Sequence, residues 1–189
     1  MRPAYPLKTA RLILRPFEEG DLDDFHAYRS REEVTRYVYD EPSDRADATR
    51  RLTNAIGMSE LTEEGDWLVM AVYSPEAERV IGDVVLKWLN EKERQGELGY
   101  IFNPEFQGKG FAREASEAIL SLGFDELGLH RMTATCDPRN EPSWRLMERL
   151  GMRREAHFRE CEKLGGEWAD LLVYAILAEE YRSRADEGR

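Results

Sequence analysis

The chain begins with a short alternation of apolar and polar residues, which predicts a strand over residues 11–17. Pro16 ends this run because proline cannot donate a hydrogen bond to a neighbouring strand. A helix is expected to open at Asp21, a residue type favoured at helix N-termini. A second, more polar helix is expected over residues 44–60. The first third of the chain is therefore predicted to be one strand followed by two helices.

The rest of the chain changes between strand and helix periodicity. Apolar runs with short polar links predict an antiparallel meander of three strands, and an apolar stripe at helical spacing then predicts a long helix. A strand, a helix, two strands and a short terminal helix complete the pattern. The predicted strands cover residues 67–73, 80–86, 97–102, 131–136, 153–163 and 168–176, and the predicted helices cover residues 110–127 and 142–150.

This order of elements predicts an α/β (α+β) fold in a single domain over residues 1–189, with a core over residues 9–182. Helices are expected to flank a central sheet of about seven strands that is mixed but mostly antiparallel. No internal repeat or linker divides the chain. A length of 189 residues also fits one domain better than two.

Net charge narrows the classes of partner. The formal charge of −11 argues against a protein that binds the phosphate backbone of nucleic acids, which needs a basic face. The same charge suits a cationic partner such as an amine, although acidity also simply keeps a protein soluble. No apolar run is long enough for a transmembrane helix, and the N-terminus lacks a signal-peptide core. A cytoplasmic protein without membrane contact is therefore expected.

Metal and disulfide chemistry find little support in the sequence. Cys136 and Cys161 show no spacing typical of a disulfide framework or a metal cluster, and they are expected to pack as small apolar residues. His26, His130 and His157 are far apart and lack the i, i+4 spacing of helical metal ligands. We therefore expect no metal site.

The segment between the strand at 97–102 and the helix at 110–127 carries the clearest chemical signal. Residues 103–113 read NPEFQGKGFAR. Gly108 and Gly110 free the backbone, so its N–H groups can converge with the helix N-terminus on one anion. The natural ligand for such a loop is a pyrophosphate.

Two common phosphate-binding motifs do not fit this loop. A P-loop requires Ser or Thr after its lysine, whereas Lys109 is followed by Gly110. A dinucleotide-binding loop requires a third glycine where this chain has Arg113, and the chain lacks the expected βαβ unit. The pattern that remains is Arg/Gln-x-x-Gly-x-Gly/Ala, which Gln107, Gly110 and Ala112 satisfy.

With its flanks, this loop resembles that of the GNAT acetyltransferases, in particular the branch that includes the ribosomal-protein N-terminal acetyltransferases. The resemblance rests on ELGYIF at 97–102, HRMTATCDPRNEPS at 130–143 and GEWAD at 166–170, and it extends from Thr9 to Arg182. Gln107 stands where the branch often has an aromatic residue or Arg, and Met152 where it often has Phe. Both replacements keep the physical role of the position.

The resemblance implies that the sheet splays between the strands at 97–102 and 131–136, and that acetyl-CoA lies in the gap as co-substrate. Its pantetheine arm would pair with the backbone of Tyr100, Ile101 and Phe102 like an added strand. Asn140 and Ser143 would lie near the thioester, unless they only cap the helix that begins there. The pyrophosphate would bind the loop residues Gln107, Gly108, Lys109, Gly110, Phe111, Ala112 and Arg113.

Acetyl transfer needs a neutral amine, a stabilised oxyanion and a proton for the thiol that leaves. Glu97 is the first candidate for the base because it lies beside the splay point, and Glu167 is the second. For the general acid we favour Ser143, with Tyr174 as the second candidate. Deprotonating an α-amine at pH 7 costs about 1 kcal/mol, against about 4.6 kcal/mol for a lysine-like amine, so an α-amine needs only a weak base.

The resemblance implies an N-acetyltransferase that acts directly on a primary amine, either a peptide N-terminus or a small molecule such as a polyamine or an amine-bearing antibiotic. A homodimer is common in this branch and is expected here. Two alternatives stay open. One is a module that senses acyl-CoA without turnover. The other is an acyltransferase for a larger donor such as succinyl-CoA, for which Arg139 or Arg145 would be the basic residue near the thioester.

Overall fold

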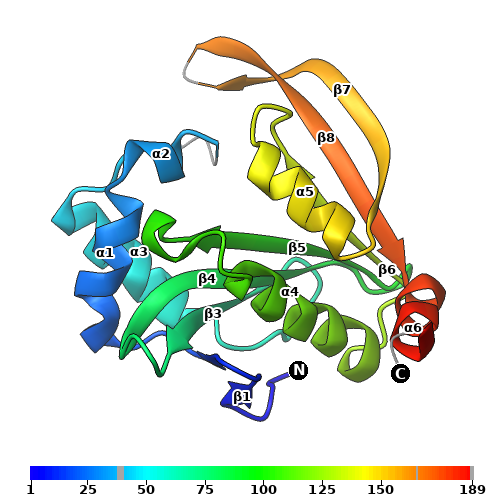
Figure 1. Cartoon of the computed structure of the whole chain (residues 1–189), viewed down its shortest axis with the longest axis horizontal. Coiled ribbons are helices and arrows are strands. Elements are labelled where there is room, and N and C mark those ends of the chain that lie inside the picture. The colour runs from blue at the N-terminus through cyan, green and yellow to red at the C-terminus, as the bar shows by residue number, and fades with distance from the viewer. Residues whose placement is uncertain (38–40, 165, 188–189) are drawn as a thin grey trace.

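An eight-stranded sheet runs through the protein in the order β1-β2-β3-β4-β5-β6-β8-β7 (Figure 1). The computed structural model describes residues 1–37, 41–164 and 166–187. Neighbouring strands are antiparallel, except for the parallel pair β5 and β6. The strands are β1 (Leu7–Lys8), β2 (Ile13–Arg15), β3 (Trp67–Ser74), β4 (Arg79–Asn90), β5 (Gln95–Phe102), β6 (Arg131–Cys136), β7 (Arg153–Leu164) and β8 (Glu167–Leu177).

The predicted fold class is confirmed, and several strand bounds differ from the prediction. The strand predicted over residues 11–17 is shorter, because β2 covers only Ile13–Arg15. The eighth strand is β1, whose two residues are too few to show an alternating pattern. β4 extends four residues beyond the predicted end, to Asn90, because its polar end pairs with the start of β5. β6 has the predicted bounds.

Helices cover both faces of the sheet. α1 and α3 pack against β3 and β4 on one face, while α4 and α5 cover the other (Figure 1). α4 continues as a π-helical turn over Leu122–Glu126. In the described part of the chain, no helix has the length and apolar character that a membrane span needs. The helices are α1 (Leu22–Arg29), α2 (Glu32–Thr35), α3 (Arg45–Gly57), α4 (Phe111–Ser121), α5 (Glu141–Arg149) and α6 (Ala178–Glu187).

Two aspartates show how local sequence places the early helices. Asp44 caps α3, because its carboxylate accepts the backbone N–H of Asp47 at 2.7 Å. Asp21 precedes α1 as predicted, but its carboxylate accepts from the Arg15 guanidinium at 2.7 Å and from the Glu18 backbone at 2.8 Å. It therefore ties the end of β2 to the start of the helix instead of capping α1.

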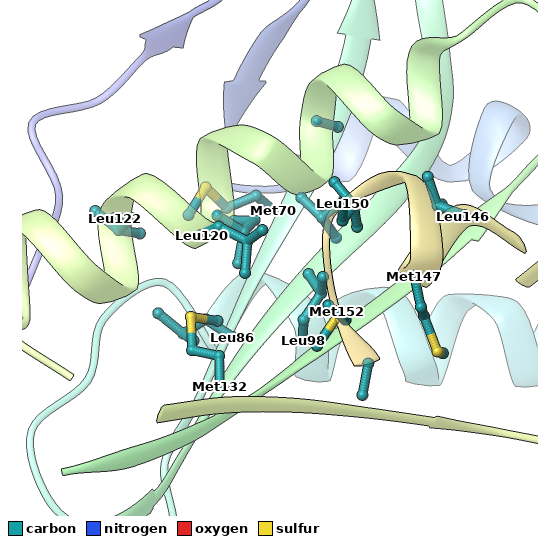
Figure 2. Packing of buried hydrophobic residues seen from close by; sticks show 14 of the residues in the cluster. Met70, Leu86, Leu98, Leu120, Leu122, Met132, Leu146, Met147, Leu150 and Met152 are labelled. Carbon is teal, nitrogen blue, oxygen red and sulfur yellow. The ribbon is translucent and has the colours of Figure 1, made fainter. Parts of the chain in front are cut away.

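The main core lies between the sheet and the helices α4 and α5. Side chains from the central strands meet leucines and methionines from the helical side (Figure 2). Each large apolar side chain buried in this way contributes roughly 1.5–3 kcal/mol relative to exposure. The residues labelled in this core are Met70, Leu86, Leu98, Leu120, Leu122, Met132, Leu146, Met147, Leu150 and Met152.

β5 divides its side chains between the two faces of the sheet. Leu98 and Phe102 belong to the core under α4 and α5, whereas Ile101 packs against the smaller core formed with α1 and α3. Strand alternation therefore places Tyr100 on the face of α4 and α5, and Glu97 on the face of α1 and α3. The side chains of Glu97 and Tyr100 therefore lie on opposite faces of the sheet.

Candidate active site

β5 and β6 are joined over only part of their length. Gln95–Glu97 pairs with Arg131–Thr133, and the pairing between these two strands ends there. β5 stays paired with β4 as far as Phe102, and β6 stays paired with β8 as far as Cys136. The two strands therefore diverge, which forms the splay predicted at this place. We call the gap between residues 98–102 and 134–136 the fork.

Half of the peptide groups of β5 face the fork. Asn103 donates its backbone N–H to the carbonyl of Ile81 on β4 at 2.9 Å, and peptide groups alternate between the two sides of a strand. The groups of Ile101 therefore point toward β4, whereas those of Tyr100 and Phe102 point into the fork. Of the three residues expected to pair with pantetheine, Ile101 is thus turned away from the gap by its backbone.

The glycine loop lies at the open end of the fork, where α4 begins. Gly108 and Gly110 have φ angles of 75° and 81°, in the left-handed region that favours glycine. The first amides of α4 have no acceptor within the helix, and the helix dipole adds positive potential there. The side-chain amide of Gln107 donates to the Phe102 carbonyl at 3.2 Å, which ties the loop to the end of β5. This arrangement suits a pyrophosphate.

An anchor from the N-terminal part of the chain holds the start of α4. Glu114 accepts hydrogen bonds from the Thr9 hydroxyl at 2.6 Å and from the Arg11 backbone at 2.7 Å. Arg11 also donates to the Lys109 carbonyl at 3.0 Å, and its guanidinium lies 4.6 Å from the ring centre of Phe111. No local pattern in the sequence signals this role of Arg11, because 103 residues separate it from Glu114.

Within the described residues, the two cations of the loop, Lys109 and Arg113, make contacts at the protein surface. The Lys109 ammonium lies 5.2 Å from the ring centre of Phe106. Arg113 pairs with Glu117 at 2.8 Å, and both side chains of this pair are about half exposed. Exposed pairs contribute little to stability, so either cation can turn toward a phosphate at small cost.

Asn140 and Ser143 lie at the start of α5, beside the fork. The Asn140 side chain accepts the Ser143 backbone N–H at 3.3 Å and so caps the helix. The Ser143 hydroxyl lies 3.0 Å from the Tyr100 hydroxyl, which also donates to the Ser143 carbonyl at 3.0 Å. Burial raises the pKa of Tyr100, so this phenol stays neutral. The structure thus brings Ser143 to the fork together with a tyrosine whose hydroxyl had no predicted role.

Glu97 lies at the base of the fork, in the last residue pair that joins β5 to β6. Its carboxylate accepts from the Lys87 ammonium at 2.5 Å, and its side chain is 20% exposed. The Lys87 ammonium also lies 4.3 Å from the ring centre of Trp67. The first candidate base is therefore a carboxylate that already binds an ammonium group. Lys87 belongs to no sequence motif. Its contact with Glu97 follows from the strand register, which places the two residues opposite each other in the β4–β5 ladder.

The other two candidates lie farther from the fork. Tyr174 is buried on β8, one strand beyond β6, and its hydroxyl donates to the Glu148 carboxylate at 3.2 Å. Glu167 is exposed at the start of β8, in the β7–β8 hairpin that projects from the sheet (Figure 1). Gly165, in the turn before it, lies outside the described residues. The candidates at the fork are therefore Glu97, on the face of α1 and α3, and Ser143, which contacts Tyr100 on the face of α4 and α5.

A sheet that forks between two parallel strands, with a glycine loop and a helix N-terminus at the open end, defines a class of acyltransferase that draws its acyl group from CoA thioesters. A family model described as an acetyltransferase (GNAT) domain matches residues 11–153. The chain belongs to this family and is an N-acetyltransferase, as the sequence resemblance predicted.

Several known proteins are similar to the chain along nearly its whole length. The uncharacterized N-acetyltransferase YnaD of Bacillus subtilis (strain 168) is 38% identical over 176 residues, which cover 93% of this chain and 98% of YnaD. A GNAT-family acetyltransferase of Bacillus anthracis has 36% identity and a TM-score of 0.82, with 92% of this chain and 99% of that chain covered. A spermidine N-acetyltransferase of Vibrio cholerae, solved in complex with CoA and spermine, has 28% identity and a TM-score of 0.76, with 92% and 99% covered.

Proposed function

We propose that this protein transfers the acetyl group of acetyl-CoA directly to a cationic primary amine. The fork carries the proposal, because peptide groups of β5 face a gap whose open end holds the glycine loop. Peptide groups along a strand edge suit an extended ligand with amides of its own, and the loop suits a pyrophosphate. CoA has both features in one molecule, so a single ligand would satisfy the fork and the loop together.

The chemistry requires one bond to form and one to break. The amine nitrogen attacks the thioester carbon, and the C–S bond then breaks with its electron pair going to sulfur. A β5 peptide N–H that faces the fork, such as that of Tyr100, would stabilise the oxyanion between these steps. The proton lost by nitrogen balances the proton gained by sulfur, so the protein has only to guide protons and hold charge.

Glu97 would receive the acceptor amine. In the structure its carboxylate already binds the ammonium of Lys87, so it has the charge and exposure that an acceptor ammonium needs. The acceptor would take the place of Lys87 and lose its proton to Glu97 or to water. Proton transfer by a positioned carboxylate typically contributes about 10²- to 10⁴-fold to the rate.

A cationic acceptor is supported by charge and by one relative. The net charge of −11 raises the local concentration of amines around the protein. A similar protein was crystallised with CoA and spermine. Polyamines and peptide N-termini both meet the chemical requirement, because each presents a primary amine with positive charge.

Thiol release from acetyl-CoA, measured with polyamines, N-terminal peptides, aminoglycosides and lysine peptides, tests the proposal. Turnover with one class of cationic amine is the expected result. Saturable binding of acetyl-CoA without turnover on any amine would instead favour a sensing module. Faster turnover with succinyl-CoA than with acetyl-CoA would overturn the choice of donor.

Replacing Glu97 with Gln tests the proposed base. We expect kcat/KM for the acceptor to fall by about 100-fold, because the carboxylate that binds the ammonium and accepts its proton is lost. Glu126→Gln is the matched control, since Glu126 is an exposed carboxylate at the opposite end of α4 from the glycine loop. If Glu97→Gln retained full activity, Glu97 would have no part in the mechanism, and Glu167→Gln would be the next variant to measure.

A further inference from the structure

Ser143 lies close to both diverging strands of the fork, β5 and β6. Tyr100 and Cys136 each lie three positions beyond the last residue pair of β5 and β6, which is Glu97 with Thr133. The Ser143 hydroxyl lies 3.0 Å from the Tyr100 hydroxyl. On the other side, burial raises the pKa of the Cys136 thiol and Ser143 lowers it in part, so the Ser143 hydroxyl also lies near β6. The hydroxyl of Ser143 is therefore held between the diverging strands, where a thioester in the fork would lie.

The phenol of Tyr100 has two partners but only one proton. When that proton is donated to the Ser143 carbonyl, a hydrogen bond between the two hydroxyls requires the Ser143 proton to point at the phenol oxygen. When it is donated to the Ser143 hydroxyl oxygen, the serine proton becomes free to point elsewhere. The direction of the phenol proton thus decides whether Ser143 can donate to a third group and still keep its hydrogen bond to Tyr100.

We infer that Tyr100 is a positioning residue for Ser143: as the C–S bond breaks, Tyr100 donates to the Ser143 hydroxyl, and Ser143 donates to the departing CoA sulfur. The inference rests on the proposed function. It adds a hydroxyl pair that stabilises charge on the leaving group, with Tyr100 acting only through Ser143. Chains of hydrogen bonds polarise one another, so the bond from Tyr100 strengthens the one that Ser143 makes.

We call the two hydroxyls of Tyr100 and Ser143 the relay. The relay stabilises negative charge on the departing sulfur without losing a proton. A thiol has a pKa of about 8.5 and a tyrosine about 10. Burial raises the pKa of Tyr100 further, so a thiolate is too weak a base to deprotonate it. The proton that finally reaches sulfur is the one released by the amine, and Tyr100 and Ser143 end the cycle neutral, as they began it.

A double-mutant cycle with Tyr100→Phe and Ser143→Ala tests the relay. Tyr100→Phe keeps the ring, and Ser143→Ala leaves Tyr100 its bond to the carbonyl of residue 143, so both variants are expected to fold. We expect Tyr100→Phe to lower kcat about 10-fold, the effect of one lost hydrogen bond, while KM and Kd for acetyl-CoA change less than about 3-fold. In the Ser143→Ala background, Tyr100→Phe should have no further effect on kcat.

Controls separate this role from a merely structural one. Tyr5→Phe removes a comparable phenol-to-carbonyl bond, that of Tyr5 to Ser59 at 2.9 Å, and should leave kcat unchanged. Ser143→Thr keeps a hydroxyl and should recover part of the rate lost in Ser143→Ala. Additive losses from Tyr100→Phe and Ser143→Ala, or a loss of CoA affinity as large as the loss of kcat, would overturn the relay alone. Absence of turnover in the unsubstituted protein would reject the proposed function and the relay with it.

Discussion

At the scale of single residues, burial sets the protonation of the groups at the fork. It raises the pKa of Tyr100, and it raises the pKa of the Cys136 thiol to about 11. Both side chains therefore stay neutral at physiological pH. A neutral thiol is a poor nucleophile. The acetyl group is accordingly expected to pass straight from sulfur to nitrogen, without an acylated cysteine between them.

Cysteine labelling checks this protonation. At pH 8 a thiol with a pKa of about 11 is ionised in about one molecule in a thousand, and Cys136 is also buried, whereas Cys161 is exposed. We expect iodoacetamide to modify Cys161 first and Cys136 far more slowly, with the rate at Cys136 rising as the pH approaches 11. Peptide mass spectrometry over time measures both sites, and denatured protein shows their intrinsic reactivity. Equal labelling rates in the folded protein would contradict the buried, neutral thiol.

At the scale of elements, the start of α4 depends on a segment from the other end of the chain. Glu114 accepts hydrogen bonds from Thr9 and Arg11. Burial alone would raise the pKa of Glu114, but these bonds outweigh it and lower the pKa. A lowered pKa in the folded state means that the stabilisation is complete above the unfolded value, about 4.3, and is lost as the pH falls through the folded value.

Replacing Glu114 with Gln should therefore destabilise the protein in a pH-dependent way. At pH 7 we expect the free energy of unfolding to fall by about 1–2 kcal/mol, because two charge-assisted bonds and one ion pair are weakened. Urea unfolding at pH 7 and near pH 4 should show this difference shrinking at the lower pH. Glu117→Gln, which breaks only an exposed pair, should change stability by less than about 0.5 kcal/mol at either pH. If Glu114→Gln lowered the free energy of unfolding equally at both pH values, the ionised Glu114 carboxylate would not be what holds Thr9 and Arg11.

Strong periodicity allowed most elements to be predicted, and weak or distant signals account for the rest. β6 and the core of α4 follow directly from apolar spacing. β1 and α2 have two and four residues, too few for any period to appear. The glycine loop was predictable because its residues are consecutive. The pairs Lys87–Glu97 and Tyr100–Ser143 were not, because they depend on strand register and on the angle of a helix across the fork.

At the scale of the whole molecule, the net charge of −11 produces an electrostatic field that attracts cationic substrates and repels anionic ones. A field of this sign attracts cations over distances near the Debye length, which is about 10 Å at 0.1 M salt and 3 Å at 1 M. We expect KM for a polyamine to rise several-fold between 0.02 M and 0.5 M NaCl, with kcat nearly constant. An aromatic amine that is uncharged at the assay pH should show no such rise. Steady-state kinetics at both salt concentrations measure this, and an unchanged KM for the polyamine would show that the acidity serves solubility alone.

The fork has a consequence for the lifetime of the protein. Only three residue pairs join β5 to β6, whereas the strands on either side are paired over longer stretches. Local unfolding begins where few contacts join neighbouring elements, and proteases cut the segments that unfold. CoA bound in the fork would stabilise the closed state. At a concentration a hundred times Kd, it would add about 2.7 kcal/mol to the free energy of opening. The concentration of CoA and its thioesters would then affect how long each molecule survives as well as how fast it works.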